Sequence, residues 1–235
     1  MKVLVNCNAR KKHESMKKHL SLLLTVGLAI SSQAGTYNIA GTSSGAIPDG
    51  DLSGWQNTIT ASSLPSIITD VKVNLTLTGG WNGDLYAYLT HGSGFAVLLN
   101  REGKGTGASY GYGTSGMNVT LGYSTAGADI HGVATPTSGG TYSADARGLW
   151  PFGSNSDFDT ATRTANLDGY NGTDPNGGWT LFFADVQGGY QSTLTGWSLD
   201  ITAVPEPVTV ALGIFGVLFG AVQGVRYFRR KTSAQ

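Results

Sequence analysis

The chain has 235 residues and a formal net charge of zero, with 35 glycines and a single cysteine. Its charges are unevenly placed, since residues 35–204 hold five Lys and Arg against thirteen Asp and Glu, a formal charge of −8. An acidic body argues against nucleic acid as a partner, because phosphate binding needs clustered Lys and Arg. The one cysteine, Cys7, precedes this body, so we expect no disulfide and no thiol chemistry in it.

A stretch typical of an export signal begins at Met16. Two lysines follow it directly, residues 20–30 form a short apolar run, and Ser-Gln-Ala ends the stretch at Ala34. Ser32 and Ala34 are small residues, and signal peptidase recognises small residues at these two positions before its cleavage site. We therefore predict that the export machinery and signal peptidase process the chain, with cleavage after Ala34 and residues 1–34 as extension and signal peptide. The sequence leaves open whether translation starts at Met1 or at Met16.

The body that follows shows short apolar alternation and no long helical period. In residues 71–78, valine and leucine alternate with polar residues, which predicts a strand with one buried face. The other predicted strands are 84–90, 95–99, 117–123, 179–186 and 194–204, and residues 35–66 are expected to supply a first strand. Strands of this length between glycine-rich turns predict an all-β domain over 35–204, an antiparallel jelly-roll sandwich.

Four segments of the body, taken in order, resemble the P domain of proprotein convertases. They are ITDVKVNLTLTGGWNGDLYAYL, MNVTLGYSTAGADIH, YSADARG and LDGYNGTDPNGGWTLFFADVQGGYQSTLTGWSLDI. The resemblance covers residues 67–201 and implies a jelly-roll fold. One departure is Ala146, which stands where the family's aromatic-x-x-Asp-Gly-Arg segment has glycine.

Calcium is the one cofactor that the body suggests. The resemblance implies that Asp70, Asp84 and Asp185 come toward one end of the sandwich, and carboxylate oxygens are ligands that Ca²⁺ prefers. The alternative, which we favour, is that these aspartates cap turns by accepting backbone N–H groups.

The C-terminal segment combines an apolar run with a basic end. Residues 208–225 carry no charge and are about as long as a bilayer span requires. The arginines that follow, Arg226, Arg229 and Arg230, are expected to stay on the cytoplasmic side, which leaves residues 35–204 outside the cytoplasm.

Pro205-Glu206-Pro207, the apolar run and the arginines together resemble a PEP-CTERM sorting signal over residues 205–235. Such signals occur in exported proteins of Gram-negative bacteria that make extracellular polysaccharide. The resemblance implies that an exosortase-type transpeptidase processes the chain near Pro205-Glu206-Pro207, where two prolines hold the backbone extended. The segment would then hold the protein in the inner membrane temporarily, before the body reaches the envelope, the surface or the medium. Permanent anchoring is the alternative.

No motif in the body predicts catalysis. The protease domain that precedes a P domain in convertases cannot fit into residues 35–66. Gly113-Thr114-Ser115 and His131 have neither the order nor the spacing of a subtilisin-like triad, and two histidines do not make a zinc site. We predict a non-enzymatic protein that binds exopolysaccharide or another surface protein. The alternatives are an envelope hydrolase with an unrecognised site and an accessory module of a separately encoded subtilisin-like protease.

Overall fold

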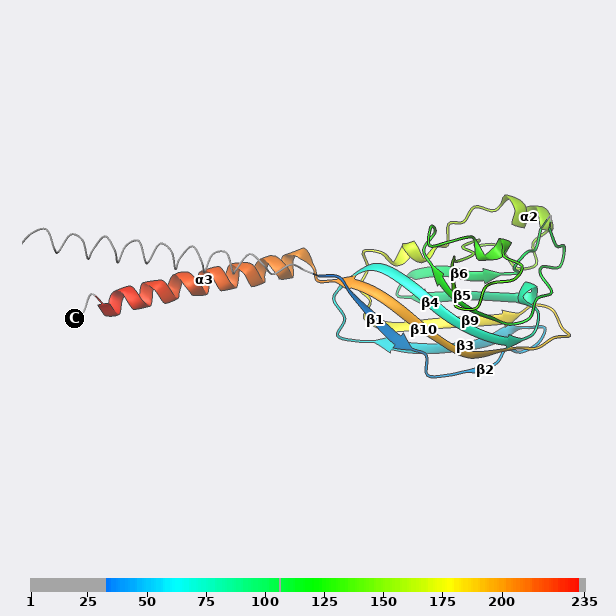
Figure 1. Ribbon diagram of the computed structural model, residues 1–235, viewed down its shortest axis with the longest axis horizontal. Helices are drawn as coiled ribbons and strands as arrows, with labels where there is room; N and C mark the ends of the chain where they lie inside the picture. The colour runs from blue at the N-terminus through cyan, green and yellow to red at the C-terminus, as the bar shows by residue number, and fades with distance from the viewer. Residues whose placement is uncertain (1–32, 106, 233–235) are drawn as a thin grey trace, which may run out of the picture. The chain divides into compact units, whose positions relative to one another are not determined.

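A computed structural model of the chain describes residues 33–105 and 107–232 (Figure 1). The predicted signal peptide lies outside the described residues, except for its last two positions. The chain divides into two compact units, of which one is Ala34–Val204 and the other contains the C-terminal helix. All the described strands belong to the first unit.

The larger sheet has six strands in the order β1-β10-β4-β7-β8, with the short β2 also paired to β10 (Figure 1). Their bounds are β1 (Gly35–Ala40), β2 (Gly45–Ala46), β4 (Ile67–Gly79), β7 (Met117–Gly122), β8 (Gly140–Ser143) and β10 (Ser192–Val204). Neighbouring strands are antiparallel except for β7 and β8, which run parallel.

The second sheet has four antiparallel strands in the order β3-β9-β5-β6. Their bounds are β3 (Asp51–Ala61), β9 (Gly177–Asp185), β5 (Leu85–His91) and β6 (Gly94–Asn100). Short helical turns interrupt the loops: η1 (Asn82–Asp84), η2 (Ile130–Gly132), α2 (Asn155–Thr160) and η3 (Leu167–Tyr170).

The predicted β-rich body is confirmed, with strands at all six stretches where the period-two pattern placed them. Two details of the prediction are wrong. Residues 35–66 supply three strands instead of one. The body is also not antiparallel throughout, because β8 joins β7 in parallel after the connection 123–139, and a parallel neighbour needs a crossover of about this length.

The apolar alternation decides which side of each strand enters the core. On β4 every second residue from Val71 to Leu77 is at most 3% exposed. On β9, in the other sheet, Trp179, Leu181 and Phe183 are fully buried. Residues of both strands belong to the same buried cluster, so the two sheets share one apolar core.

Trp197 links the two sheets by a directional contact. It lies on β10 of the larger sheet, and its indole Nε1 donates a hydrogen bond to Oδ1 of Asn57 on β3 of the other sheet (3.0 Å). A side chain at Gly41 would overlap the indole ring, so this close approach requires glycine there. The ring therefore joins β10 to β3 at this point.

The C-terminal unit contains α3 (Pro207–Thr232). Residues Pro207–Tyr227 form the one candidate membrane span among the described residues, with a mean hydropathy of 2.0 and none of the span buried. Leu212, Phe215 and Phe219 are each about two-thirds exposed. This helix includes the predicted span 208–225 and is a candidate membrane anchor.

We expect Trp197→Phe to lower the free energy of unfolding by about 1–3 kcal/mol, because it removes the donor to Asn57 and leaves space beside Gly41. Urea unfolding of the full chain in non-ionic detergent, followed by circular dichroism, measures this. The matched control is Trp150→Phe, whose ring is 65% exposed and should change stability by less than about 0.5 kcal/mol. Equal effects of the two substitutions would contradict the role given to Trp197.

Candidate functional site

The structure separates the three aspartates predicted to bind calcium. Asp185 pairs opposite Leu85 across β9 and β5, which places it beside Asp84. Asp70 lies opposite Thr202 near the start of β4, with Lys72 3.8 Å from its carboxylate. The part of β4 from Asp70 to Gly79 extends about 30 Å, and Asp84 follows its far end. The predicted grouping of Asp70 with Asp84 and Asp185 is therefore wrong, because Asp70 lies at one end of β4 and the other two lie beyond its other end.

An arginine occupies the space beside the remaining pair. The Arg101 side chain is 2% exposed; its Nη2 lies 3.4 Å from Oδ1 of Asp84, and its Nε donates to the Gly83 carbonyl at 2.9 Å. The guanidinium supplies the positive charge that a metal ion would supply there. Within residues 33–105 and 107–232, no group of three or more His, Cys, Asp or Glu side chains could hold a metal ion. The residues present do not fit the predicted calcium site.

Asp185 is fully buried in this region. Its Oδ1 accepts a hydrogen bond from the Gln187 backbone (3.2 Å), and its Oδ2 has no hydrogen-bond partner among the described residues. Burial raises the pKa of Asp185 to about 7, and the negative charges of Asp84 and Asp49 add to the rise. The group therefore changes charge near neutral pH, unlike an exposed aspartate.

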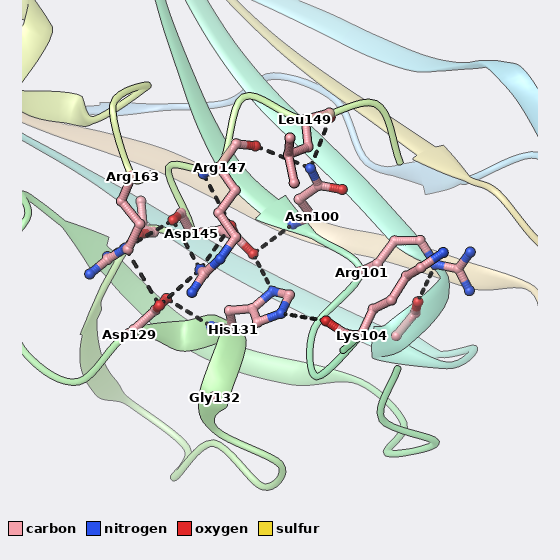
Figure 2. A network of polar contacts seen from close by, with 12 residues as sticks. Asn100, Arg101, Lys104, Asp129, His131, Gly132, Asp145, Arg147, Leu149 and Arg163 are labelled. Atoms are coloured by element: carbon pink, nitrogen blue, oxygen red, sulfur yellow. Dashed lines mark hydrogen bonds and ion pairs between the residues drawn. The ribbon is translucent and has the colours of Figure 1, made fainter. Parts of the chain in front are cut away.

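A second polar cluster, centred on Asp145, connects loops that lack regular structure (Figure 2). The Asp145 carboxylate is fully buried and accepts hydrogen bonds from the backbone of Asn100 and from the backbone and Nη1 of Arg147, each at 3.2 Å. Arg147 also contacts Asp129 at 2.8 Å, and Nε of Arg163 donates to the Asp145 carbonyl at 3.0 Å. The positive charges of Arg147 and Arg163 thus compensate the negative charges of Asp129 and Asp145. A buried charge requires such compensation.

His131 completes this cluster, but its geometry does not suit a catalytic base. Its Nδ1 lies 2.7 Å from Oδ2 of Asp145, a pairing that also occurs in hydrolytic triads. Its Nε2, which would face a nucleophile in a triad, instead lies 3.0 Å from the carbonyl oxygen of Lys104. Both ring nitrogens are therefore engaged by oxygens of the body itself. The Phe158 ring stacks beside it, with centroids 5.8 Å apart.

Ala146 follows Asp145 with a left-handed backbone, φ 61°. Glycine adopts this conformation most readily, and glycine is the residue that the P-domain pattern has at this position. The Ala146 backbone is held on both sides, since its N–H donates to Val97 and its carbonyl accepts from Ala165. These two bonds explain how alanine is tolerated there.

Glu102 was not singled out from the sequence, although it is the most unusual acid in the body. It is fully buried, and neither carboxylate oxygen has a hydrogen-bond partner among the described residues. Burial raises its pKa well above the ordinary value, and the charges of Asp145 and Asp129 add to the effect. Its neighbour Arg101 has a positive φ of 54°. The only sequence signal was a lone glutamate between an apolar strand and a glycine-rich loop, which normally indicates exposure.

His91 lines a cleft of about 530 Å³ between the β5–β6 turn and the segment 169–178. Its ring stacks on Trp179 with centroids 3.9 Å apart. Nδ1 lies 2.9 Å from the Gly178 carbonyl oxygen and Nε2 lies 2.7 Å from that of Asp174. Both ring nitrogens are therefore engaged by the backbone, which gives His91 a structural role in holding this loop.

The two predicted processing points directly precede β1 and directly follow β10, which are paired strands of the larger sheet. β1 begins at Gly35, directly after Ala34, and Gly35 pairs with Ala203 near the end of β10. Only Pro205 and Glu206 separate β10 from α3. Pro207 is the first residue of the helix and is not extended, because the fixed φ of proline suits a first helical position. Arg226, Arg229 and Arg230 lie in the last part of α3.

No family model matches this chain, and no curated protein sequence matches it either. Among solved structures, a chain of the Aeromonas sobria serine protease–chaperone complex is similar, with 15% sequence identity and a TM-score of 0.37. The match covers 74% of this chain and 27% of that one. The Aeromonas sobria serine protease itself is similar at 15% identity and a TM-score of 0.38, with 73% of this chain and 26% of that chain covered.

Glu102→Gln should change how stability depends on pH. Because the folded-state pKa of Glu102 is raised, stability is fully present below about pH 4.5 and falls as pH rises through the folded-state pKa. The variant has no proton to release at this position, so it should lose less stability than the native chain between about pH 5 and pH 8. Urea midpoints of the full chain across this range measure the difference.

The control for this prediction is Glu206→Gln, which changes the exposed glutamate between β10 and α3. It should leave the pH dependence as it is in the native chain. An unaltered pH dependence in Glu102→Gln would show that Glu102 is not buried as an acid.

Asp185 should titrate with a midpoint near 7, which carboxyl ¹³C chemical shifts of the full chain in detergent can follow. The signal is assigned by its loss in Asp185→Asn. Since the folded form holds this proton more tightly than the unfolded form, stability should fall as pH rises from about 4 to about 7 and then level. The comparison is Asp51 of β3, which is exposed and pairs opposite Asp185. Hydrogen bonds from Ser53 lower the pKa of Asp51. A titration midpoint of Asp185 near that of Asp51 would contradict the raised pKa of Asp185.

Proposed function

We propose that the chain is an exported, non-catalytic protein whose body is a jelly-roll sandwich of P-domain type. The C-terminal segment sorts it to the cell envelope, the surface or the medium. In its mature form it binds exopolysaccharide or another surface component and has no catalytic role. The observation that carries the proposal is the order of parts at the C-terminus: a last strand, Pro205-Glu206-Pro207, an apolar helix and terminal arginines.

The exposure of α3 supports the membrane part of this proposal. Apolar side chains such as Leu212, Phe215 and Phe219 are about two-thirds exposed, which suits lipid and is unfavourable in water. The charges that follow are all positive, which favours a cytoplasmic C-terminus.

The pairing of Gly35 with Ala203 supports processing at both ends of the body. Cleavage after Ala34 would leave β1 complete, and cleavage near Pro205-Glu206-Pro207 would leave β10 complete. Both points lie at one end of the same strand pair, so enzymes at a single membrane surface could reach them. With only Pro205 and Glu206 outside regular structure, a transpeptidase would need to unwind the first turn of α3, where Val210 donates to the Glu206 carbonyl.

The polar geometry of the body supports a non-catalytic role. The nitrogen of His131 that could accept a proton from a nucleophile lies against a backbone carbonyl instead. Ser115 is exposed, and within the described part of the chain no hydrogen bond joins it to a histidine. The buried charges of the Asp145 cluster are compensated by one another, which is what loop stabilisation requires.

The test replaces Pro205, Glu206 and Pro207 together by alanine in the native host. Intact masses of the protein from the envelope and from the medium then show where each end is cut. Native protein should lack α3, whereas the triple variant should give a longer product in the inner membrane. Thr209→Ala, in the first turn of α3, is the control and should be processed normally. A mature native protein that keeps Arg226, Arg229 and Arg230 would mean that the helix is a permanent anchor.

A further inference from the structure

The outward side of the second sheet carries a continuous group of aromatic rings. Tyr88 of β5 stacks on Phe182 of β9, with centroids 4.6 Å apart and planes 17° apart. Phe95 of β6 and Tyr86 of β5 lie on either side of Tyr88, at centroid distances of 5.2 and 5.9 Å. Trp150 comes from the loop between β8 and α2. Together with Trp150, these four residues form what we call the aromatic platform. None of its five members belongs to the buried core cluster.

Trp150 forms one wall of a hollow beside the other rings of the platform. A pocket of about 210 Å³ is bounded by Leu52, Tyr86, Tyr88, Trp150, Pro151, Phe182 and Ala184. Trp150 is 65% exposed, yet the backbone before it is fixed, because Nδ2 of Asn100 donates to the carbonyl oxygens of Arg147 (3.1 Å) and Leu149 (3.0 Å; Figure 2). The Asp145 cluster therefore holds the loop that carries Trp150. A preformed hollow of this size suits one sugar ring better than a drug-sized ligand.

The charge of the platform restricts its ligand. The polar outward-facing residues in the middle of β3, β9 and β5 are uncharged: Gln56, Thr58, Thr60, Thr180 and Thr90. The exposed Asp51, next to Leu52 of the hollow, is an acid at the start of β3. The body around them has a formal charge of −8, so it repels polyanions. A polycation would find no carboxylate on the platform itself. The negative charge of the body also disfavours the pairing of two copies through this face. The surface therefore fits a neutral partner.

The phenol groups add polar recognition to this surface. Neither Tyr86 nor Tyr88 forms a side-chain hydrogen bond with any residue that the structure describes, so both hydroxyls are available to a ligand. Burial raises the pKa of Tyr86, and Tyr88 and Asp145 add to the rise, so its hydroxyl keeps its proton at neutral pH. Rings beside free hydroxyls match a sugar, whose C–H groups pack on the electron-rich ring face and whose hydroxyls exchange hydrogen bonds.

We propose that the aromatic platform binds a neutral polysaccharide chain, with one sugar ring held in the hollow between Trp150 and the sheet. This inference rests on the proposed function, because it names the polymer class that the exported body would bind and the face that binds it. Trp150 and Tyr88 supply stacking area, and the Tyr86 hydroxyl supplies a donor.

Affinity electrophoresis of the full chain in non-ionic detergent tests the proposal. The gels contain a soluble neutral glucan, a neutral galactomannan or, as the charged counterpart, polygalacturonate. At least one neutral polymer should retard the native chain, and polygalacturonate should not. Trp150→Ala should weaken binding roughly fivefold to a hundredfold, the scale on which loss of an aromatic side chain weakens the binding of a stacked nucleobase. Tyr86→Phe, which keeps the ring, should weaken it about fivefold through the lost hydrogen bond.

Tyr123→Ala is the matched control, since Tyr123 is 40% exposed and follows β7 in the other sheet. It should bind like the native chain, and circular dichroism should show that all variants are folded. If a neutral polymer retards Trp150→Ala and the Tyr123→Ala control equally, the aromatic platform is not the binding face. Such a result would still leave polysaccharide binding as the role of the body. Equal retardation by polygalacturonate would overturn the neutral class.

Two further outcomes would also overturn the platform proposal. One is that no neutral polymer retards the native chain. The other is that size-exclusion chromatography detects a dimer that Trp150→Ala disrupts, in which case this face binds a second copy. Neither result affects the processing of the C-terminus, which the masses of the mature protein decide separately.

Discussion

The pairing of β10 with its neighbours is the constraint on which the rest of the body depends. β10 lies inside the larger sheet, between β1 and β4, so the last strand of the body joins its first strand to its centre. Its residues Ala203 and Val204 pair with Ile68 and Ile67, and Pro205-Glu206-Pro207 follows directly. The body therefore includes its first and its last strand as paired neighbours, and the proposed processing would leave it complete only with both cuts outside this pair.

A second constraint is the burial of charge outside the sheets. The loops between β6 and η3 have little regular structure, and a set of ion pairs and backbone hydrogen bonds around Asp145 holds them. Such groups are costly to bury unless they are compensated, so the cluster fixes the loops in one arrangement. Glu102 is the exception, since it is buried with no hydrogen-bond partner among the described residues, and burial raises its pKa well above the ordinary value. The position of Trp150 follows from this cluster through Asn100.

The two sides of the body therefore have different properties. Apolar residues that alternate along β4 and β9 face the shared core, where they contribute burial of apolar surface. The opposite side of the second sheet keeps large rings half-exposed, although threonine or glutamine fills the neighbouring positions. The Tyr88–Phe182 pair across β5 and β9 also contributes to the stability of the sheet. These half-exposed rings are the surface on which the proposed polysaccharide would stack.

The sequence by itself determined the β-rich body, its six recognisable strands and the candidate membrane helix, because period-two alternation and an uncharged apolar run are local patterns. Only the tertiary structure decided which strands are neighbours. It separated Asp70 from Asp84 and Asp185, made β8 parallel to β7, and buried Glu102 beneath loops that look exposed in the sequence. These results depend on contacts between residues far apart in the chain, and no local pattern encodes them.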